Sequence, residues 1–186
     1  HSSEDRYHVQ FYHLSGLESY QANGLQIACT NALPDHVDAL LIPGSYAHSA
    51  QALAQVTALF GERRDIFLEL QAGGTLIAAG CNGSFGLAAT GLLDGGEATT
   101  CWFLAEHFQQ LFPRVLLKPA ETVARSGSCF TAGATTAYLQ LCLQLIAEFD
   151  GARFSSQLAK VLLVEPAFHS QAPFLSVEQL VTHQDD

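Results

Sequence analysis

The sequence predicts an α/β fold in which helices cover a doubly wound, mostly parallel β-sheet. Short apolar segments that end near Gly alternate with segments of helical periodicity, most clearly between residues 37 and 90. Two of the apolar segments are nearly continuous, which is typical of parallel strands buried on both faces. The chain has 186 residues and 48% hydrophobic content, which is enough for one domain with a substantial core.

Three strands are expected in the first quarter of the chain. Residues 7–14 alternate in polarity and are rich in aromatic side chains, and residues 25–29 follow the turn-forming pair Asn23-Gly24. Residues 37–43 are almost entirely apolar and end in Pro-Gly, as expected of a buried strand that leads into a loop.

Two helices, a strand and a third helix are expected next. Residues 49–59 have helical spacing with a serine as the N-cap, and residues 63–71 continue helically until a pair of glycines ends them. The apolar run at 75–79 predicts a buried strand, and the small residues at 82–90 predict the helix after it.

The remaining elements are shorter. Extended segments are expected at 98–101, 115–117 and 123–131, the last with a turn at 125–128. Helices are expected at 102–111, 134–149 and 152–163, and a polar terminal stretch begins at Ser170. In the helix at 134–149, the spacing predicts one buried face made of Leu139, Cys142, Leu143 and Ile146.

Cys81 lies where a buried strand passes directly into a helix. Gly80 precedes it and Gly83 follows it, so we expect the sharp strand–turn–helix of a nucleophile elbow. Glycine is expected at both positions because a tight turn needs a positive φ or a close backbone approach. A thiol at a helix N-terminus has a lowered pKa, which makes Cys81 a candidate nucleophile. The alternative is a buried cysteine that acts as a small hydrophobic residue.

Three strand ends are expected to meet at one edge of the sheet. Gly44, Cys81 and the loop at 131–134 each follow an apolar strand. Ligands of open α/β sheets bind outside the carboxyl ends of the strands. We therefore expect a pocket at this edge.

Composition narrows the class of protein. The net charge of −10 repels phosphate, so this segment itself is not expected to bind DNA or an anionic membrane. The sequence has no run of 18 apolar residues and no signal peptide pattern, so no membrane segment is expected. The five cysteines are widely spaced and lack zinc-site spacing, which favours a reducing, cytoplasmic location without a metal or other cofactor.

Five segments in order carry a family resemblance. They are residues 38–44, 81–95, 98–102, 131–137 and the Ser-Gln-Ala-Pro-Phe sequence at 170–174. Together they resemble the class I glutamine amidotransferase-like (ThiJ/PfpI-type) domain, in the form found at the N-terminus of AraC-type transcription regulators. The resemblance runs from about residue 7 to the end of the chain.

The resemblance implies a flavodoxin-like three-layer α/β/α sandwich whose elbow cysteine faces a small pocket near a dimer interface. It implies that the family's first strand–helix unit, which carries an acidic partner of the cysteine in active relatives, is missing before His1. Residues 1–175 would form the domain, and residues 176–186 would begin a linker to a C-terminal helix-turn-helix domain.

The sequence departs from the catalytic pattern of this family at four places. Cys101 and Asn82 stand where many relatives have histidines, and Ser45 stands where the family commonly has a second glycine. His169 does not match the His-x-Glu pair of glutamine amidotransferases. A thiol is a poor base at neutral pH. Cys101 therefore either replaced a histidine that was not needed, or forms a redox pair or soft-metal site with Cys81.

The favoured function is a ligand-sensing and dimerising domain of an AraC-type transcription regulator, without catalysis. Its partners would be a small-molecule effector, a second copy of the chain and, through the C-terminal domain, DNA. The expected ligand-binding residues are Gly44, Ser45, Cys81, Asn82, Cys101, Trp102, Gly133 and Ala134. Some relatives recognise amines or quaternary ammonium compounds. Trp102 could offer such a ligand a cation–π face, or it could serve helix packing.

The alternative function is a cysteine-dependent hydratase or amidohydrolase that acts on a small nitrogenous compound. Cys81 would be the catalytic nucleophile, and the amides of Asn82 and Ser45 would form the oxyanion hole. A chaperone-like or purely interacting role is a further alternative.

Overall fold

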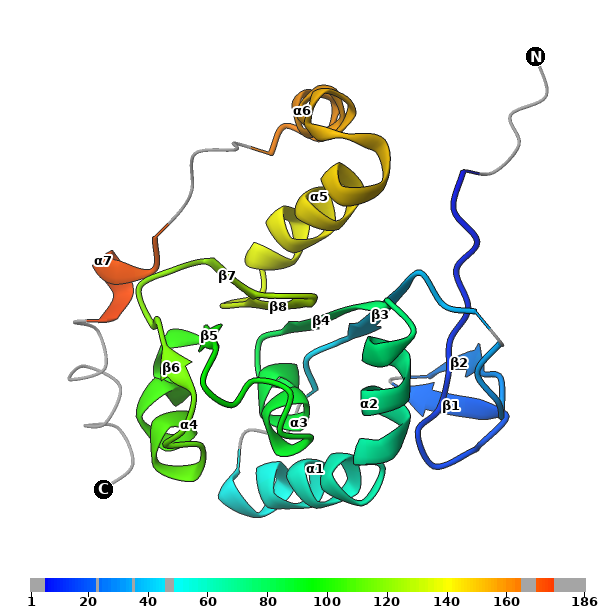
Figure 1. The fold of residues 1–186 in the computed structure, drawn as a ribbon, viewed down its shortest axis with the longest axis vertical. Helices are drawn as coiled ribbons and strands as arrows, with labels where there is room; N and C mark the ends of the chain where they lie inside the picture. The colour runs from blue at the N-terminus through cyan, green and yellow to red at the C-terminus, as the bar shows by residue number, and fades with distance from the viewer. Residues whose placement is uncertain (1–5, 23, 35, 46–48, 165–169, 176–186) are drawn as a thin grey trace. The chain divides into compact units, whose positions relative to one another are not determined.

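The computed structural model describes residues 6–22, 24–34, 36–45, 49–164 and 170–175 (Figure 1). The contacts within the chain divide it into two compact units, His1–Val37 and Asp38–Asp186. No helix in the described ranges is long and apolar enough to cross a membrane.

The first unit contains a β-hairpin. Its strands are β1 (Ser19–Ala22) and β2 (Leu25–Ala28), which pair antiparallel across a turn that includes Gly24 at a φ of 81°. The predicted strand at 25–29 is confirmed, but the one predicted at 7–14 is wrong, because only an isolated bridge from Tyr12 to Thr30 forms there. Val9 and Phe11 are exposed, so their polarity pattern does not mark a buried face.

The second unit is built around a four-stranded sheet with the order β3-β4-β8-β7. The strands are β3 (Ala39–Ile42), β4 (Leu76–Gly80), β8 (Cys129–Ala132) and β7 (Val123–Ser126). The first three are parallel, and β7 is antiparallel to β8. A separate parallel pair joins β5 (Glu97–Ala98) to β6 (Leu116–Leu117). The register places the carboxyl ends of β3, β4 and β8 together, as the sequence predicts.

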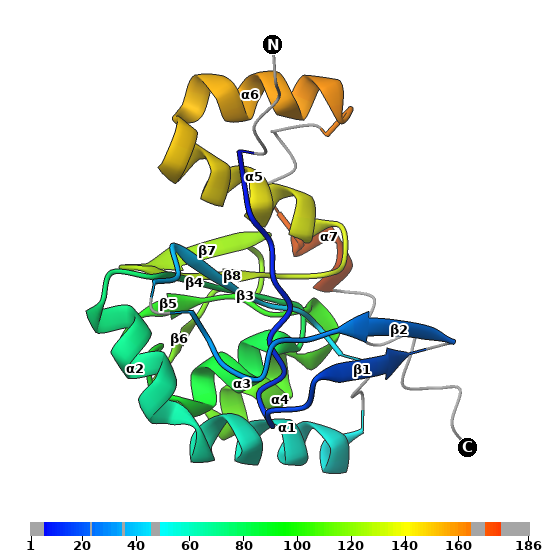
Figure 2. The same ribbon diagram turned by 90° about the vertical axis from the view of Figure 1, so that its right-hand side faces the viewer.

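Helices cover both faces of this sheet, which confirms the three-layer α/β/α arrangement (Figures 1 and 2). The layer on one face contains α1 (Ala50–Glu62), α2 (Arg64–Ala72) and α3 (Gly83–Ala89). The layer on the other face contains α5 (Ala137–Asp150), on which α6 (Ala152–Val161) packs. The remaining helices are η1 (Trp102–Leu104), α4 (Ala105–Leu111) and α7 (Ala172–Leu175). The predicted cap is confirmed, because the Ser49 hydroxyl accepts from the Ala52 amide at 3.2 Å.

The core between the sheet and α5 corrects one prediction. Ala137, Leu141 and Leu145 share one face of α5 and pack on Phe130 and the small residues of the sheet. Leu139, which was expected in the core, is 48% exposed. Leu143 is buried on a second face, where the Ser155 hydroxyl of α6 donates to its carbonyl at 2.7 Å. The single-face prediction is wrong because α5 has partners on two sides.

Close backbone packing places α3 against β3. A Cβ added to Gly83 would lie 2.8 Å from the Pro43 carbonyl oxygen and 2.9 Å from that of Ile42. Because both are backbone atoms, the helix would have to move away from the strand. Gly61, inside α1, offers the opposite case, since its nearest neighbour would be the Ala89 carbonyl oxygen at 3.8 Å.

Replacing these two glycines with alanine should therefore change stability in opposite directions. Gly83→Ala is expected to lower the free energy of unfolding by about 1–3 kcal/mol through overpacking. Gly61→Ala is expected to raise it by about 0.5–1 kcal/mol, because alanine loses less backbone entropy in a helix. Urea unfolding followed by circular dichroism measures both values. Equal shifts in the two variants would contradict the close packing of α3 on β3.

Candidate functional site

The predicted elbow is present at the carboxyl end of β4. Cys81 has a φ of 53°, a left-handed conformation that is uncommon for a residue with a side chain. Its backbone N–H donates to the carbonyls of Ala132 and Gly133, at 2.9 and 3.1 Å. These bonds fasten the elbow to the end of β8, so that the turn directs the Cys81 side chain away from the strand.

The glycines beside Cys81 fulfil one of the two roles expected of them, which is close packing. The positive φ belongs to Cys81 itself, and both Gly80 and Gly83 are needed for close packing. A Cβ on Gly80 would lie 2.3 Å from the Cζ atom of Tyr138, because the tyrosine ring lies directly against the glycine. The prediction of close backbone approach is thus confirmed, whereas positive φ at these glycines is not observed.

Tyr138 also connects α5 to the loop after β3. Its hydroxyl accepts a hydrogen bond from the Gly44 N–H and donates to the Gly80 carbonyl at 3.2 Å. A Cβ on Gly44 would lie 3.0 Å from the Cβ of Cys81, so this loop touches the elbow. Burial raises the pKa of Tyr138, so its hydroxyl stays protonated at neutral pH.

Asn82 holds the same loop from the other side of Cys81. Its side-chain oxygen accepts from the Ser45 N–H at 2.7 Å, and its side-chain nitrogen donates to the Ser45 carbonyl at 2.9 Å. The asparagine is 1% exposed. It therefore occupies the expected position of a second catalytic group while serving as a bridge between the elbow and the loop.

The thiol of Cys101 lies beside the thiol of Cys81. The pKa of Cys81 falls to about 7, chiefly because the Cys101 thiol donates a hydrogen bond to it. The backbone N–H of Asn82 assists, whereas burial opposes the shift. The same hydrogen bond and burial raise the pKa of Cys101, so that this thiol keeps its proton at neutral pH. The lowered pKa thus depends first on a neighbouring thiol, whereas a helix N-terminus was the expected cause.

Two hydroxyls bridge the elbow and the segment that carries Cys101. Those of Ser84 and Thr100 lie 2.8 and 3.1 Å from the Cys81 carbonyl oxygen, and 2.8 Å from each other. The Thr100 oxygen is also 3.9 Å from the Cys101 sulfur. Both Ser84 and Thr100 are fully buried, so the contacts between these two segments are shielded from water.

Gln171 is a site residue that the sequence did not reveal. It is 3% exposed, and its carboxamide lies 2.3 Å from where a Cβ of Gly133 would be. Its oxygen accepts from the Ala134 N–H at 3.1 Å, and its nitrogen lies 3.1 Å from the Thr100 carbonyl and 2.9 Å from that of Glu121. In the sequence, only its place in the 170–174 motif pointed to it. A polar residue in a polar terminal stretch is otherwise expected to be exposed.

The structure thus brings together most of the expected ligand-binding residues. Those that meet around the elbow are Gly44, Ser45, Cys81, Asn82 and Cys101. Gly133 and Ala134 lie at the end of β8, where Gln171 contacts them. Trp102 packs edge-on against Phe103, with ring centroids 5.3 Å apart. His169 lies outside the described residues.

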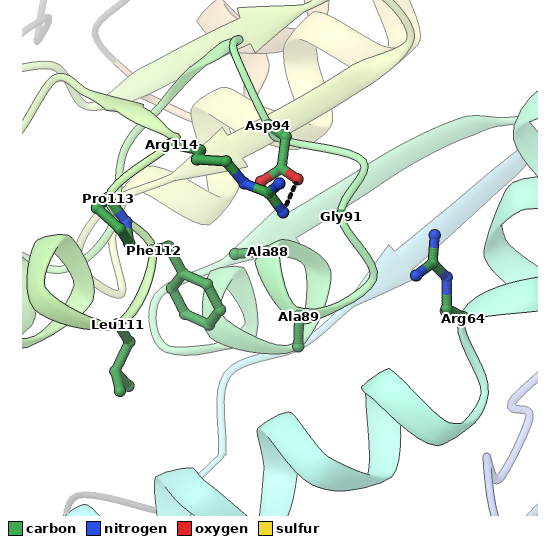
Figure 3. Close-up of a pocket in the computed structure, with 9 residues that line it drawn as sticks. All are labelled: Arg64, Ala88, Ala89, Gly91, Asp94, Leu111, Phe112, Pro113 and Arg114. Carbon is green, nitrogen blue, oxygen red and sulfur yellow. Dashed lines mark ion pairs between the residues drawn. The ribbon is translucent and has the colours of Figure 1, made fainter.

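A surface cavity of about 280 Å³ lies elsewhere in the second unit (Figure 3). Arg64 and Arg114 stand on opposite sides of it, and Arg114 pairs with Asp94 at 2.6 Å. None of the residues that line it belongs to the expected ligand-binding set. In the ranges that the structure describes, no group of three or more His, Cys, Asp or Glu side chains is arranged to hold a metal ion.

Comparison with known proteins gives the chain relatives of two kinds. It is 27% identical over 168 residues to the HTH-type transcriptional regulator GbdR of Pseudomonas aeruginosa, which covers 88% of this chain and 43% of the regulator. It is 31% identical over 160 residues to the isonitrile hydratase of Pseudomonas putida, which covers 82% of this chain and 64% of the hydratase. The chain therefore spans less than half of the regulator and less than two thirds of the hydratase.

A solved structure has the same fold as this chain, and a family model matches its sequence. An AraC family transcriptional regulator from Pseudomonas putida superposes with a TM-score of 0.58 at 16% identity, over 80% of this chain and 77% of that one. At this identity the likeness shows a common fold. The family model for DJ-1/PfpI proteins matches residues 4–148, a range that includes the elbow. Because this match covers most of the sequence, the chain belongs to the DJ-1/PfpI family.

Proposed function

We propose that the chain is the ligand-sensing and dimerising part of an AraC-type transcription regulator. Residues 1–175 form the sensing domain, and residues 176–186 begin the linker to a DNA-binding segment. The domain binds a small metabolite around the elbow without transforming it. The proposed contacts are Gly44, Ser45, Cys81, Asn82, Cys101, Trp102, Gly133 and Ala134.

The observation that carries this proposal is that the loop amides beside Cys81 are already hydrogen-bonded within the chain. The Gly44 N–H is taken by the Tyr138 hydroxyl, and the Ser45 N–H by the Asn82 side chain. Amide hydrolysis through a cysteine nucleophile needs N–H donors that are aimed at a developing oxyanion. Here two of the available donors maintain the shape of the site instead, which favours binding over catalysis.

The protonation states of the site support the same proposal. Cys81 is partly ionised near neutral pH, but its neighbour Cys101 keeps its proton because its pKa is raised. Cys101 therefore cannot accept a proton from water or substrate at neutral pH. The carboxamide of Asn82 is not a base either. The described groups beside the thiolate thus orient it without supplying acid–base catalysis.

Gln171 supplies a route from the site to the end of the domain. It belongs to the segment that leads toward residues 176–186, and it contacts the Thr100 carbonyl next to Cys101 and the Ala134 amide next to Gly133. A ligand that displaces either loop changes the hydrogen bonds of Gln171. A sensing domain requires such a link between the occupied site and the segment that carries the signal onward.

The relatives are consistent with a regulator of which this chain is one part. The transcriptional regulator that it resembles is more than twice as long as the matched segment. The net charge of −10 makes this segment unfavourable for DNA, so contacts to phosphates would come from a separate, basic segment. The full-length protein is therefore expected to bind DNA upstream of its own gene, with an affinity that changes when the metabolite binds.

Mobility-shift titrations with the full-length protein test this function directly. Binding to the upstream DNA that responds to a metabolite supports the proposal. A full-length protein that contains no basic helix-turn-helix segment, or that ignores its upstream DNA at low salt, would overturn it. The titrations are made at a fixed salt concentration, because affinity for DNA depends strongly on salt.

An isonitrile hydratase is the second candidate, favoured by the 31% identity to that enzyme. We expect the chain to hydrate a small alkyl isonitrile to the N-substituted formamide no faster than the Cys81→Ala variant does. The reason is that the amides of the loop after β3 are occupied and Cys101 stays protonated. Formamide production is followed by chromatography. Turnover that disappears in Cys81→Ala would favour the enzyme.

The role of Gln171 gives a prediction that does not need the natural ligand. Gln171→Leu removes the hydrogen bonds that the side chain makes with the Ala134 N–H and with the Thr100 and Glu121 carbonyls, so we expect it to lower the free energy of unfolding by about 1–3 kcal/mol. Gln110→Leu, on the exposed face of α4, is the matched control and should change stability by less than about 0.5 kcal/mol.

Coupling between the site at Cys81 and the segment at 170–175 is measured by amide hydrogen exchange in that segment. Attaching an acetamide group to Cys81 with iodoacetamide mimics an occupied site and displaces the Cys101 thiol. This modification should change amide exchange in the segment of the wild-type chain and of Gln110→Leu, but not of Gln171→Leu. The same change in all three proteins would show that Gln171 does not carry the signal.

A further inference from the structure

We propose that Cys81 and Cys101 form an oxidisable dithiol, in which a hydroperoxide oxidises Cys81 and Cys101 then closes an intramolecular disulfide. The proposal goes beyond ligand sensing, because it requires neither a metabolite in the site nor a DNA-binding segment. It gives a redox role to two thiols that the proposed function uses only as ligand contacts.

The two cysteines lie next to each other in the fold. Both are reduced in this structure, and the Cys101 thiol donates a hydrogen bond to the Cys81 sulfur. The segments that carry them are joined through Thr100, whose hydroxyl oxygen lies 3.1 Å from the Cys81 carbonyl oxygen and 3.9 Å from the Cys101 sulfur. A disulfide between the two sulfurs would therefore join segments that are already in contact.

The two thiols differ in solvent access and in charge. Cys81 is half-buried, and its pKa of about 7 means that a large share of it is thiolate at neutral pH. Cys101 is 0% exposed, and its pKa is raised by its bond to Cys81 and by burial. The oxidant therefore meets a thiolate at Cys81, while Cys101 remains protonated and protected until Cys81 has reacted.

The chemistry proceeds in two balanced steps. The Cys81 thiolate attacks one oxygen of the hydroperoxide, the O–O bond breaks, and the departing alkoxide or hydroxide takes a proton from water. Cys81 is now a sulfenic acid. The Cys101 sulfur then attacks the Cys81 sulfur, the S–S bond forms and the S–O bond breaks. The sulfenic oxygen leaves as water with the Cys101 proton, and a dithiol reductant restores both thiols.

Two other cysteines of the same unit are poor competitors. Burial raises the pKa of Cys129, which is 1% exposed in β8, and also the pKa of Cys142 in α5. Both are therefore mostly protonated at neutral pH, and a protonated thiol reacts slowly with a hydroperoxide. Among the four cysteines of the second unit, the structure thus assigns the first oxidation to Cys81.

The test treats the whole chain with one equivalent of hydrogen peroxide at neutral pH. Intact-mass measurement should show the loss of two hydrogen atoms, reversed by dithiothreitol. Chymotryptic peptides, prepared without reduction, should contain Cys81 linked to Cys101. In Cys101→Ser, the product should instead carry an added oxygen on Cys81, which dimedone traps as the sulfenic acid.

Three results would overturn the proposal. In the first, the wild-type chain gains oxygen at Cys81, as Cys101→Ser does. In the second, the disulfide joins Cys81 to a cysteine other than Cys101. In the third, the chain does not react with the peroxide. Circular dichroism shows whether the variant has kept the fold. Cys101→Ala, which also lacks the second sulfur, provides an independent comparison.

The two Cys101 variants also separate the hydrogen bond from the sulfur chemistry. The rate of Cys81 alkylation by iodoacetamide should rise with pH as the thiolate forms, with a midpoint near pH 7 in the wild-type chain. Serine keeps a hydrogen-bond donor, so Cys101→Ser should retain this midpoint. Alanine removes the donor, so the midpoint in Cys101→Ala should move up toward the ordinary range of a thiol. Equal midpoints in Cys101→Ala and the wild-type chain would contradict the contact between the two thiols.

Discussion

The left-handed backbone of Cys81 is the constraint on which the rest of the site depends. A residue with a side chain adopts this conformation only when its surroundings enforce it, at a cost of about 1–3 kcal/mol. The amide bonds from Cys81 to the end of β8 provide that enforcement. Gly80 and Gly83 then follow as steric requirements, because the turn brings one against the Tyr138 ring and the other against the carbonyls of β3.

At the same turn, side chains hold the loops around the Cys81 thiol through hydrogen bonds to the loop backbone. Tyr138 and Asn82 each reach the loop after β3, and Gln171 reaches the loop after β8. Each of these side chains satisfies a loop amide that would otherwise need water or a ligand. These three loop amides are thus committed to side chains in the described part of the chain, which supports the proposed recognition of a ligand over stabilisation of a short-lived anion.

The sequence predicted what depends on neighbours along the chain and missed what depends on distant partners. The elbow and most elements from β3 onward follow from local apolar runs and glycines, and they are observed. The strand expected at 7–14 is wrong because a strand needs a partner, which its own pattern cannot supply. The buried face of α5 was assigned wrongly because a second layer, α6, buries Leu143. Gln171 was missed because only tertiary structure shows that its carboxamide is buried.

The sequence left two alternatives for Cys101, one of which was an interaction with Cys81. In the structure the Cys101 thiol donates a hydrogen bond to the Cys81 sulfur. A histidine beside the thiolate would stabilise it as a cation and could return a proton to a substrate. A thiol stabilises the same thiolate through a hydrogen bond, but its own proton is then held more tightly. Replacing the imidazole with a thiol therefore keeps an activated Cys81 and removes the proton transfer that hydrolysis needs. Oxidation to a disulfide is a chemistry that remains available to two adjacent sulfurs.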